Sequence, residues 1–275
     1  MLINGEPGQT IPVNDRGLLY GDGIFETIRV INRQLSLWQL HQRRLLNSCN
    51  LLGIDVDLPK LLEELNSLLG ASAADGIAKV IVTRGVGGRG YQPGDATEPT
   101  RIVQFHPLPD AYNQDKQGGV RVKFCNQPIT VNSRLGGLKH LGRLDQVMAS
   151  SELTDEYDEG LMSTDSGLVV EGTKSNLFVV INDSLVTPGL HNAGVAGVMR
   201  EFLMGQFASD GFPVHEAKLN REDLLNASEV FLCNSVFGVW PVTELVYENK
   251  SHNKKVGRFT RLALEFQDNE FCSYN

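Results

Sequence analysis

Apolar and polar positions in the first third of the chain change from one period to another. Residues 25–31 are rich in β-forming side chains that alternate at a period of two, and a polar turn then leads into residues 35–37. This pattern predicts a β-hairpin. Over residues 38–52 the apolar side chains recur at helical spacing, which predicts a helix. A second helix is predicted over residues 58–69, with Pro59 in its first turn.

Further along the chain, short β-rich runs alternate with amphipathic helical patterns. The expected strands cover residues 79–83, 101–105, 120–125, 160–163, 177–181 and 230–233, and the expected helices cover residues 143–154, 198–209 and 256–266. A polar stretch with no periodicity separates the two halves. We therefore expect an α+β protein of two domains: a smaller N-terminal α/β domain (1–109), a linker (110–118) and a larger C-terminal domain (119–275).

Composition narrows the classes of protein that the chain can belong to. Of 275 residues, 41% are hydrophobic and 21% are charged with interspersed signs, which is typical of a globular protein. A net charge of −8 argues against a sequence-independent grip on nucleic acid. No apolar run reaches the length of about 18 residues that spans a membrane, and the N-terminus lacks the pattern of a secretory signal.

The four cysteines are widely scattered and include no C-x-x-C pair. Such usage predicts free thiols in a reducing compartment. We therefore expect a soluble, cytoplasmic protein with a small-molecule substrate, and no nucleic-acid, membrane or metal partner.

A glycine-rich segment imitates a nucleotide-binding motif. Residues 85–90 (G-V-G-G-R-G) match G-x-G-x-x-G and follow a predicted strand. In a dinucleotide-binding fold the motif opens a helix, whereas here it runs into turn residues and then into another strand. A nucleotide-binding dehydrogenase is therefore disfavoured. We interpret the segment as a flexible or close-approach loop, whose Arg89 and Tyr91 point either into a pocket or into solvent.

A lysine and a glutamate stand in settings that suit a phosphate-bearing cofactor. Lys139 lies in an apolar, glycine-flanked segment just before a predicted helix, and a desolvated lysine is nucleophilic, as Schiff-base chemistry requires. Glu171 ends an apolar run, where a carboxylate could keep a cofactor's pyridine nitrogen protonated. Taken one at a time, a solvated lysine and a surface glutamate are the simpler explanations.

Three other positions could bind the phosphate of such a cofactor. Residues 194–200 (G-V-A-G-V-M-R) form a loop that opens a helix, where free N–H groups and the helix dipole favour an anion. Ser235 and Val236 follow a strand and could donate a hydroxyl and a backbone N–H, and Arg44 could supply a positive charge. An ordinary loop and a solvated helix face are the alternatives.

In this order and spacing the segments resemble the fold-type IV pyridoxal 5'-phosphate enzymes. This family includes branched-chain aminotransferases, D-amino-acid aminotransferases and aminodeoxychorismate lyases. Residues 15–27 (D-R-G-L-L-Y-G-D-G-I-F-E-T) are similar to its N-terminal signature, residues 41–45 (H-Q-R-R-L) to its H-x-x-R-L helix, and residues 171–178 to its E-G-x-x-x-N-L-F run. The resemblance implies a homodimer, and a larger domain with a β-barrel-like sheet and flanking helices.

The resemblance also implies roles for individual residues. Lys139 matches the catalytic Schiff-base lysine, and Glu171 matches the partner of the pyridine nitrogen of pyridoxal 5'-phosphate. Arg44, rather than Arg43, matches the phosphate-binding arginine. The remaining implied cofactor contacts are Gly197, Val198, Met199, Ser235 and Val236.

Three features of the sequence are similar to the lyase branch of the family. Residues 84–91 (R-G-V-G-G-R-G-Y) resemble the lyase loop, and Tyr91 stands where D-amino-acid aminotransferases have a histidine. Leu144 stands where branched-chain aminotransferases have a tyrosine. Residues 139–147 resemble the lyase pattern K-H-L-N-R-L-x-Q-V, with Gly142 in place of the asparagine.

The lyase resemblance implies conversion of 4-amino-4-deoxychorismate to 4-aminobenzoate and pyruvate, through an external aldimine, in folate biosynthesis. The substrate carries two carboxylates, for which Arg29, Arg89 and Tyr91 are the candidate ligands. A D-amino-acid or branched-chain aminotransferase on the same scaffold is the main alternative, because a fold does not fix a function. A non-catalytic binding protein that retains the fold is a further alternative.

Overall fold

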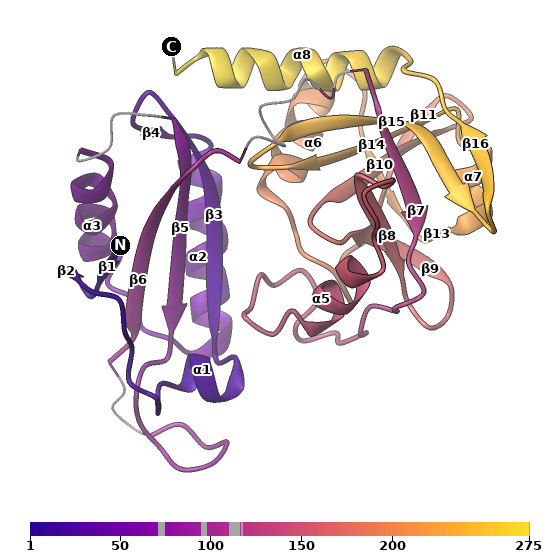
Figure 1. Ribbon diagram of the computed structural model, residues 1–275. Helices are drawn as coiled ribbons and strands as arrows, with labels where there is room; N and C mark the ends of the chain where they lie inside the picture. The colour runs from indigo at the N-terminus through magenta and orange to yellow at the C-terminus, as the bar shows by residue number, and fades with distance from the viewer. Residues whose placement is uncertain (71–74, 95–97, 110–115, 117, 275) are drawn as a thin grey trace. The chain divides into compact units, whose positions relative to one another are not determined.

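The computed structural model describes residues 1–70, 75–94, 98–109, 116 and 118–274, which form two compact units (Figure 1). The first unit comprises Met1–Asp110, Lys139–Gly142 and Ser273–Asn275, and the second comprises Ala111–Leu138 and Arg143–Cys272. The domain limits expected from the sequence remain predictions. Of the expected linker, residues 110–115 and 117 lie outside the described residues.

The first unit contains a six-stranded sheet in the order β2-β1-β6-β5-β3-β4, with every neighbouring pair antiparallel. Its strands are β1 (Leu2–Ile3), β2 (Glu6–Pro7), β3 (Gly23–Ile31), β4 (Gln34–Leu35), β5 (Gly76–Thr83) and β6 (Thr100–Pro107), and its helices are α1 (Arg16–Tyr20), α2 (Trp38–Leu52) and α3 (Leu58–Gly70).

The alternation in β3 decides which face of this sheet is covered. Ile24, Ile28 and Val30 are buried, whereas the residues between Glu26 and Val30 that point the other way are half-buried. The buried face carries α2 against β3 and α3 against β6 (Figure 1). The expected hairpin is confirmed, and Asn32 and Arg33 form its turn with φ of 47° and 63°. This left-handed conformation matches the twist of a two-residue hairpin.

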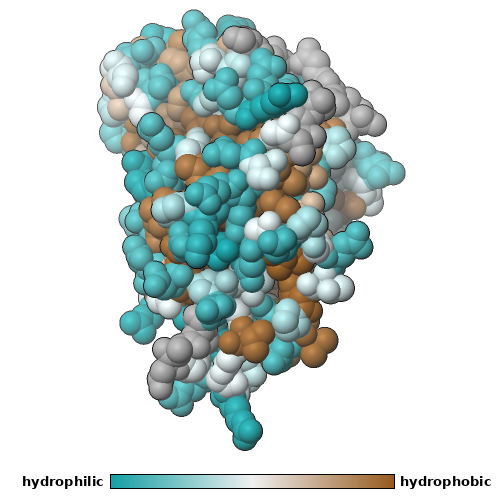
Figure 2. Space-filling view, turned by 90° about the vertical axis from the view of Figure 1, so that its left-hand side faces the viewer, coloured by the Kyte–Doolittle hydropathy of each residue, from teal (hydrophilic) through white to brown (hydrophobic). Residues whose placement is uncertain are grey.

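Helices α2 and α3 confirm the helical periods of the sequence. Helix α2 has the predicted bounds and ends at Gly53, whose φ of 65° closes the last turn. Leu45, Cys49 and Leu61 are fully buried beneath the sheet. The side of this unit that carries α3 is mostly hydrophilic at its surface, with apolar side chains between the polar ones (Figure 2).

The second unit contains a ten-stranded sheet in the order β12-β11-β10-β14-β15-β7-β8-β9-β13, with β16 paired to β15. Its strands are β7 (Val120–Phe124), β8 (Glu159–Ser163), β9 (Leu168–Gly172), β10 (Asn176–Ile181), β11 (Ser184–Pro188), β12 (His215–Ala217), β13 (Leu219–Asn220), β14 (Glu229–Asn234), β15 (Gly238–Tyr247) and β16 (Lys250–Asn253). Its helices are α5 (Leu144–Ser151), α6 (Val198–Ser209), α7 (Arg221–Asn226) and α8 (Arg258–Cys272).

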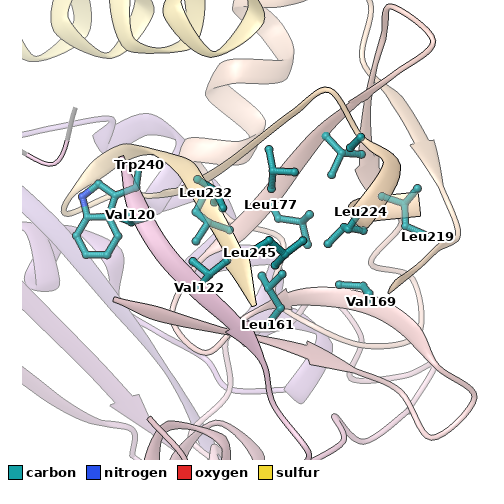
Figure 3. Close-up of a cluster of buried hydrophobic side chains, with 14 of the residues drawn as sticks. Val120, Val122, Leu161, Val169, Leu177, Leu219, Leu224, Leu232, Trp240 and Leu245 are labelled. Carbon is teal, nitrogen blue, oxygen red and sulfur yellow. The ribbon is translucent and has the colours of Figure 1, made fainter. Parts of the chain in front are cut away.

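This sheet curls around its own core. Strand β9 also contacts β10 and β11, so strands that are distant in the sheet order approach one another. Leu161, Leu177 and Leu245 come from three different strands and point toward one another inside the curl (Figure 3). Removal of this apolar surface from water is the main stabilising term. The core therefore fixes the positions of the strand ends that carry the candidate site.

The structure bears on the expectations for the cysteines and for membrane-spanning segments. All four cysteines are free thiols, as their spacing predicts. Across the described ranges of the chain, no helix combines the length and the apolar character needed to cross a membrane.

Candidate active site

Lys139 lies beside the first residues of β3 in the first unit. The N–H of Phe25 donates to the carbonyl of Lys139 over 3.1 Å, and the N–H of Leu141 donates to the carbonyl of Gly23 over 3.0 Å. Lys139 is half-buried, and its Nζ lies 4.3 Å from the centroid of the Phe25 ring. The lysine is therefore held by backbone pairing against an aromatic face, and not on a solvated helix end.

The same segment explains part of the departure from the lyase pattern at position 142. The N–H of Gly142 donates to Nδ1 of His140 over 3.2 Å. A Cβ at this position would lie only 3.2 Å from that nitrogen, so a side chain would require the His140 ring to shift. Glycine and this orientation of the ring therefore fit together.

Arg44, on α2, pairs with Glu26, the residue that follows Phe25 on β3. Its Nε donates to Oε1 of Glu26 over 2.8 Å and its Nη2 to Oε2 over 2.5 Å. Nδ1 of His41, one helical turn earlier, lies 2.6 Å from Oε2. Glu26 is 1% exposed; burial alone would raise its pKa, but the charge and hydrogen bonds of Arg44 and His41 outweigh burial and lower it to about 2.

The buried cluster also fixes the charge state of His41. Burial lowers the pKa of His41, although its hydrogen bond to Glu26 opposes this effect. His41 is therefore neutral near pH 7, and its Nδ1 donates to Glu26. The charge of Arg44 is therefore already paired with the Glu26 carboxylate before any phosphate binds.

Glu171, on β9 of the second unit, is 4% exposed and not a surface residue. Its Oε2 accepts the N–H of Val195 over 2.7 Å, and its Oε1 accepts Nε2 of Gln146 over 3.2 Å. Glu171 also opposes the effect of burial on Arg143: burial lowers the pKa of Arg143, and the charges of Glu171 and Asp145 raise it. The carboxylate is therefore oriented by an amide and a backbone N–H.

The loop before α6 packs tightly against Glu171. Gly194 has a φ of 78°, and a Cβ there would lie 3.0 Å from Oε2 of Glu171. A Cβ on Gly197 would lie 1.9 Å from Oδ1 of Asn176, and Nδ2 of Asn176 donates to the carbonyl of Val195 over 2.8 Å. Both positions therefore require glycine.

Gly197 is the N-cap of α6, and Val198 and Met199 are its buried first residues. Within the described part of the chain, no side chain caps this end of the helix. The first N–H groups of a helix lack intrahelical acceptors, so an anion can accept from them.

Ser235 and Val236 follow β14 in a turn that Asn234 organises. Oδ1 of Asn234 accepts the N–H groups of Val236 and Phe237 over 2.8 Å each. Nδ2 of Asn234 donates to the carbonyl of Lys174 over 3.1 Å, which ties this turn to the segment after Glu171. The predicted phosphate contact through the N–H of Val236 thus has a competing acceptor in Asn234.

The residues of the second unit fit a pyridine cofactor that carries a phosphate. A glycine-lined, uncapped helix N-terminus suits a phosphate, and the buried, oriented carboxylate of Glu171 suits a protonated ring nitrogen. The structure joins Glu171, the loop before α6 and the Asn234 turn by hydrogen bonds. Lys139 and Arg44, by contrast, both lie against β3 in the first unit.

The candidate substrate ligands all belong to the first unit. Arg29 lies on the half-buried face of β3, the face that also carries Phe25. Burial lowers the pKa of the Arg29 guanidinium, and the charge of Asp75 opposes this. Arg89 and Tyr91 are exposed on the loop between β5 and β6, with 87% of the Tyr91 side chain accessible.

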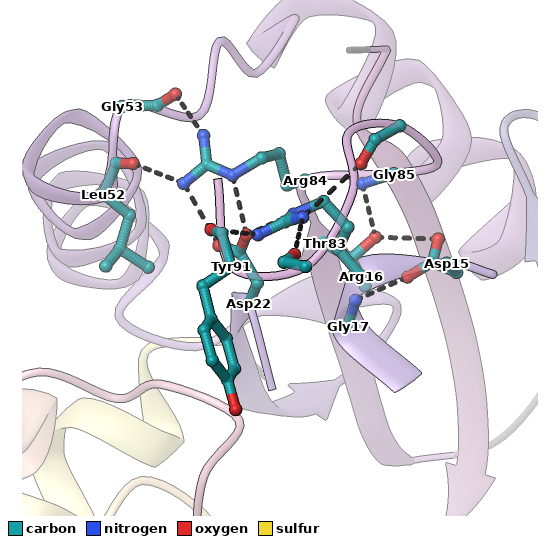
Figure 4. Close-up of polar contacts among 12 residues, drawn as sticks. Asp15, Arg16, Gly17, Asp22, Leu52, Gly53, Thr83, Arg84, Gly85 and Tyr91 are labelled. Atoms are coloured by element: carbon teal, nitrogen blue, oxygen red, sulfur yellow. Dashed lines mark hydrogen bonds and ion pairs between the residues drawn. The ribbon is translucent and has the colours of Figure 1, made fainter. Parts of the chain in front are cut away.

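That loop carries the G-x-G-x-x-G match, and its geometry differs from a nucleotide-binding turn. Among the described residues between Gly90 and β6 there is no helix for the motif to open. A Cβ on Gly85 would lie 1.9 Å from the carbonyl oxygen of Glu98, which confirms a close approach of backbone. Beside the loop, Arg16 and Arg84 both donate to the carboxylate of Asp22 (Figure 4).

No role was assigned to Glu26 or Gln146 from the sequence. Glu26 stands in the buried, otherwise apolar row of β3, and a carboxylate in such a row must be paired; the alternation was therefore an available signal. Gln146 contacts Glu171, 25 positions later, and spacing alone gives no indication of that contact.

Two sheets with flanking helices are the architecture of the pyridoxal-phosphate-dependent enzymes of fold type IV. The family model described as amino-transferase class IV matches residues 23–245. The chain belongs to this family, whose enzymes use pyridoxal 5'-phosphate.

Relatives of known structure and name agree on the fold. The crystal structure of a 4-amino-4-deoxychorismate lyase from Pseudomonas aeruginosa is 42% identical, covers 96% of both chains and superimposes with a TM-score of 0.91, which confirms the expected fold class. An aminodeoxychorismate lyase from Vibrio harveyi is 34% identical over 94% of this chain and 96% of its own. A putative branched-chain-amino-acid aminotransferase from Methanocaldococcus jannaschii is 32% identical over 96% and 92%.

Proposed function

We propose that the chain is a pyridoxal-phosphate-dependent lyase that converts 4-amino-4-deoxychorismate to 4-aminobenzoate and pyruvate. The observation that carries this choice is the 42% identity, over 96% of both chains, to the Pseudomonas aeruginosa lyase. Tyr91 and Leu144, which differ from the residues of the two aminotransferase branches, support the same branch.

We assign the cofactor contacts residue by residue. Lys139 would hold pyridoxal 5'-phosphate covalently, and Glu171 would pair with its ring nitrogen. Its phosphate would be held by Arg44, Ser235 and Val236 together with the start of α6 (Gly197, Val198 and Met199). When bound, pyridoxal 5'-phosphate supplies a covalent attachment for the substrate amine and an electron sink.

Lys139 is the catalytic base in this proposal. Its amine takes the proton from the ring carbon that bears the substrate nitrogen. The electron pair of that C–H bond forms a ring double bond while the bond to the enolpyruvyl oxygen breaks. The enol then receives the proton on its methylene carbon, which gives pyruvate. No water or oxidant enters, so the products together have the composition of the substrate, and formation of an aromatic ring drives the reaction.

Glu171 would keep the ring nitrogen protonated, and hydrogen bonds from Val195 and Gln146 set the orientation of its carboxylate. A fixed carboxylate needs little reorganisation during the reaction, which is the main electrostatic advantage of a buried site. Arg29, Arg89 and Tyr91 bind the two carboxylates of the substrate as cationic and hydroxyl donors. The enzyme acts as a cytoplasmic homodimer in folate biosynthesis.

An aminotransferase is the second candidate. The Methanocaldococcus jannaschii relative, putatively a branched-chain aminotransferase, is 32% identical over 96% of this chain, so the same scaffold is compatible with a second half-reaction. The two functions differ in their products and not in their cofactor.

Product analysis separates the two functions. Purified protein is supplied with pyridoxal 5'-phosphate and 4-amino-4-deoxychorismate, and in a parallel reaction with D-alanine or a branched-chain amino acid plus a keto acid. We expect equal amounts of 4-aminobenzoate and pyruvate in the first reaction and little product in the second. Transamination without 4-aminobenzoate would show that the lyase assignment is wrong.

A further inference from the structure

Arg16 contacts more of the loop between β5 and β6 than any spacing in the sequence indicates. Its side chain is 4% exposed. Its backbone N–H donates to Gly85 over 2.9 Å, Nη1 to Gly90 over 3.1 Å and Nη2 to Tyr91 over 2.9 Å, in each case to the carbonyl oxygen (Figure 4). Nη1 also lies 3.4 Å from the carbonyl oxygen of Gly87. One arginine thus contacts four carbonyls within the seven residues Gly85–Tyr91 of this loop.

Besides Arg16, backbone bridges of Val86 with Asp15 and of Arg89 with Gln92 hold this loop. Four of the seven residues in Gly85–Tyr91 are glycines with positive φ, from 59° at Gly90 to 147° at Gly87. A Cβ on Gly90 would meet nothing within 4 Å. Glycine loses more conformational freedom on ordering than any other residue. Hydrogen bonds from Arg16 to the backbone therefore add to these bridges in a segment that has few side chains to pack.

The guanidinium of Arg16 is itself fixed by an ion pair with Asp22. Nε of Arg16 donates to Oδ2 of Asp22 over 2.9 Å, and Arg84 donates to both oxygens of the same carboxylate. Arg84 also donates to the carbonyls of Leu52 and Gly53, where α2 ends. Burial would raise the pKa of Asp22, but Arg84 and Arg16 lower it, so the carboxylate is charged at neutral pH. The loop is thereby connected to a helix of the unit's core.

Two exposed side chains stand on the loop that is held in this way. Tyr91 packs edge-to-face on Tyr20, with 5.5 Å between the ring centroids, and the Arg16 guanidinium lies 4.9 Å from the Tyr20 ring. Arg16 binds the carbonyls of Gly87 and Gly90, and Arg89 lies between these two residues in the sequence. The carbonyls are therefore directed to the buried guanidinium, while Arg89 and Tyr91 are exposed.

We propose that Arg16 is a positioning residue, which sets the backbone of Gly85–Tyr91 so that Arg89 and Tyr91 are preorganised to bind the substrate's carboxylates. The part that concerns the substrate rests on the proposed function; the part that concerns the loop does not. A preformed loop binds without an ordering cost, so loss of the contacts should weaken substrate binding more than it slows the chemical step.

The test compares Arg16→Gln and Arg16→Lys with Arg101→Gln. Arg101 is also a largely buried arginine of the first unit, paired with Glu64 over 2.7 Å, but it does not contact the loop. Arg16→Lys keeps the charge beside Asp22 but not the planar fork that reaches several carbonyls. It therefore carries the test if Arg16→Gln does not fold.

The first measurement is the rate of trypsin cleavage after Arg89 in ligand-free protein under native conditions, followed by mass spectrometry. Cleavage of a folded protein reports local opening. We expect Arg16→Gln to be cut about tenfold faster than wild type and Arg16→Lys several-fold faster, with Arg101→Gln close to wild type at this bond. An Arg16→Gln rate equal to that of Arg101→Gln would overturn the proposal.

The second measurement is the kinetics of the loaded enzyme with 4-amino-4-deoxychorismate. We expect KM to rise about tenfold in Arg16→Gln while kcat and the visible cofactor band stay near wild type. Faster cleavage with an unchanged KM would overturn the role in substrate binding. If wild type forms no 4-aminobenzoate, the proposed function fails, and the cleavage rates still decide whether Arg16 holds the loop.

Discussion

Two buried glutamates, one in each unit, have opposite surroundings. Glu26 on β3 receives hydrogen bonds from Arg44 and His41 of α2, and this cluster lowers its pKa to about 2. Glu171 on β9 receives hydrogen bonds from a backbone N–H and from the amide of Gln146. Both carboxylates are almost inaccessible to solvent, so their exposure does not distinguish them.

The difference separates a structural carboxylate from one suited to chemistry. The charged guanidinium of Arg44 stabilises Glu26 within the fold and engages both of its oxygens. The backbone N–H of Val195 and the amide of Gln146 orient Glu171, and Arg143 interacts with its charge. Such a carboxylate is placed to act on a cationic ring nitrogen. We therefore expect changes at Glu26 to affect stability and changes at Glu171 to affect rate.

Replacement of Lys139 has the largest expected effect. Lys139→Ala removes both the covalent attachment and the base, so turnover should fall by roughly four orders of magnitude or more, and the visible band of the bound cofactor should disappear. Absorbance after gel filtration and a pyruvate assay measure the two effects. Lys60→Ala, at an exposed position of α3, is the control and should match wild type. A yellow, active Lys139→Ala protein would contradict the site.

Glu171→Ala should follow, with a loss of rate and not of fold. Loss of a preorganised electrostatic contact costs about 10²–10³-fold in kcat. The cofactor should stay bound, because Lys139 and the phosphate contacts are unchanged. The measurement is kcat together with cofactor content per subunit and the midpoint of urea unfolding. A near-normal kcat would remove the electronic role of Glu171.

Glu26→Gln should act on stability instead. A fall in pKa from 4.5 to about 2 corresponds to roughly 3 kcal/mol of free energy of unfolding at neutral pH. Because the folded pKa is depressed, this stabilisation is present above about pH 4.5 and is lost as the pH falls toward 2. Urea unfolding between pH 7 and pH 2.5 should show a steep loss in wild type. Glu26→Gln should be less stable at pH 7 and less sensitive to acid.

Gln146→Leu has the smallest expected effect and refines the account of Glu171. Loss of one hydrogen bond of 3.2 Å from an amide to the Glu171 carboxylate should lower kcat about tenfold, with little change in cofactor content or unfolding midpoint. Gln146→Glu places a second carboxylate beside Glu171 and should lower kcat further. If both variants have the kcat of wild type, the hydrogen bond from Gln146 does not support Glu171.

The sequence predicted the elements in which period and turn chemistry agree, such as the β3–β4 hairpin and α2. Strand β15, the longest of the second sheet, was not predicted. Pro241 interrupts its ladder of donors, and its register shifts between Val242 and Glu244, so its burial does not alternate. Continuous burial on both faces removes the period by which an exposed strand is detected.

The candidate site was predicted through family resemblance, because its residues are divided among distant segments. Their supporting contacts were not predicted: Arg16 meets carbonyls more than 70 positions later, and Gln146 meets a glutamate 25 positions later. Hydrogen bonds of this kind depend on tertiary packing, which local propensity does not encode. Only Glu26 left a local signal, as a charge in an apolar row.

Reductive trapping tests the central claim most directly. Protein incubated with pyridoxal 5'-phosphate is treated with borohydride, which converts a lysine–cofactor bond to a stable amine, and is then digested with trypsin. We expect one labelled peptide, residues 135–143, in which the modified Lys139 is no longer cut, and no label in Lys139→Ala. A label on another lysine, or none on wild-type protein, would contradict the assignment of Lys139 and with it the proposed lyase.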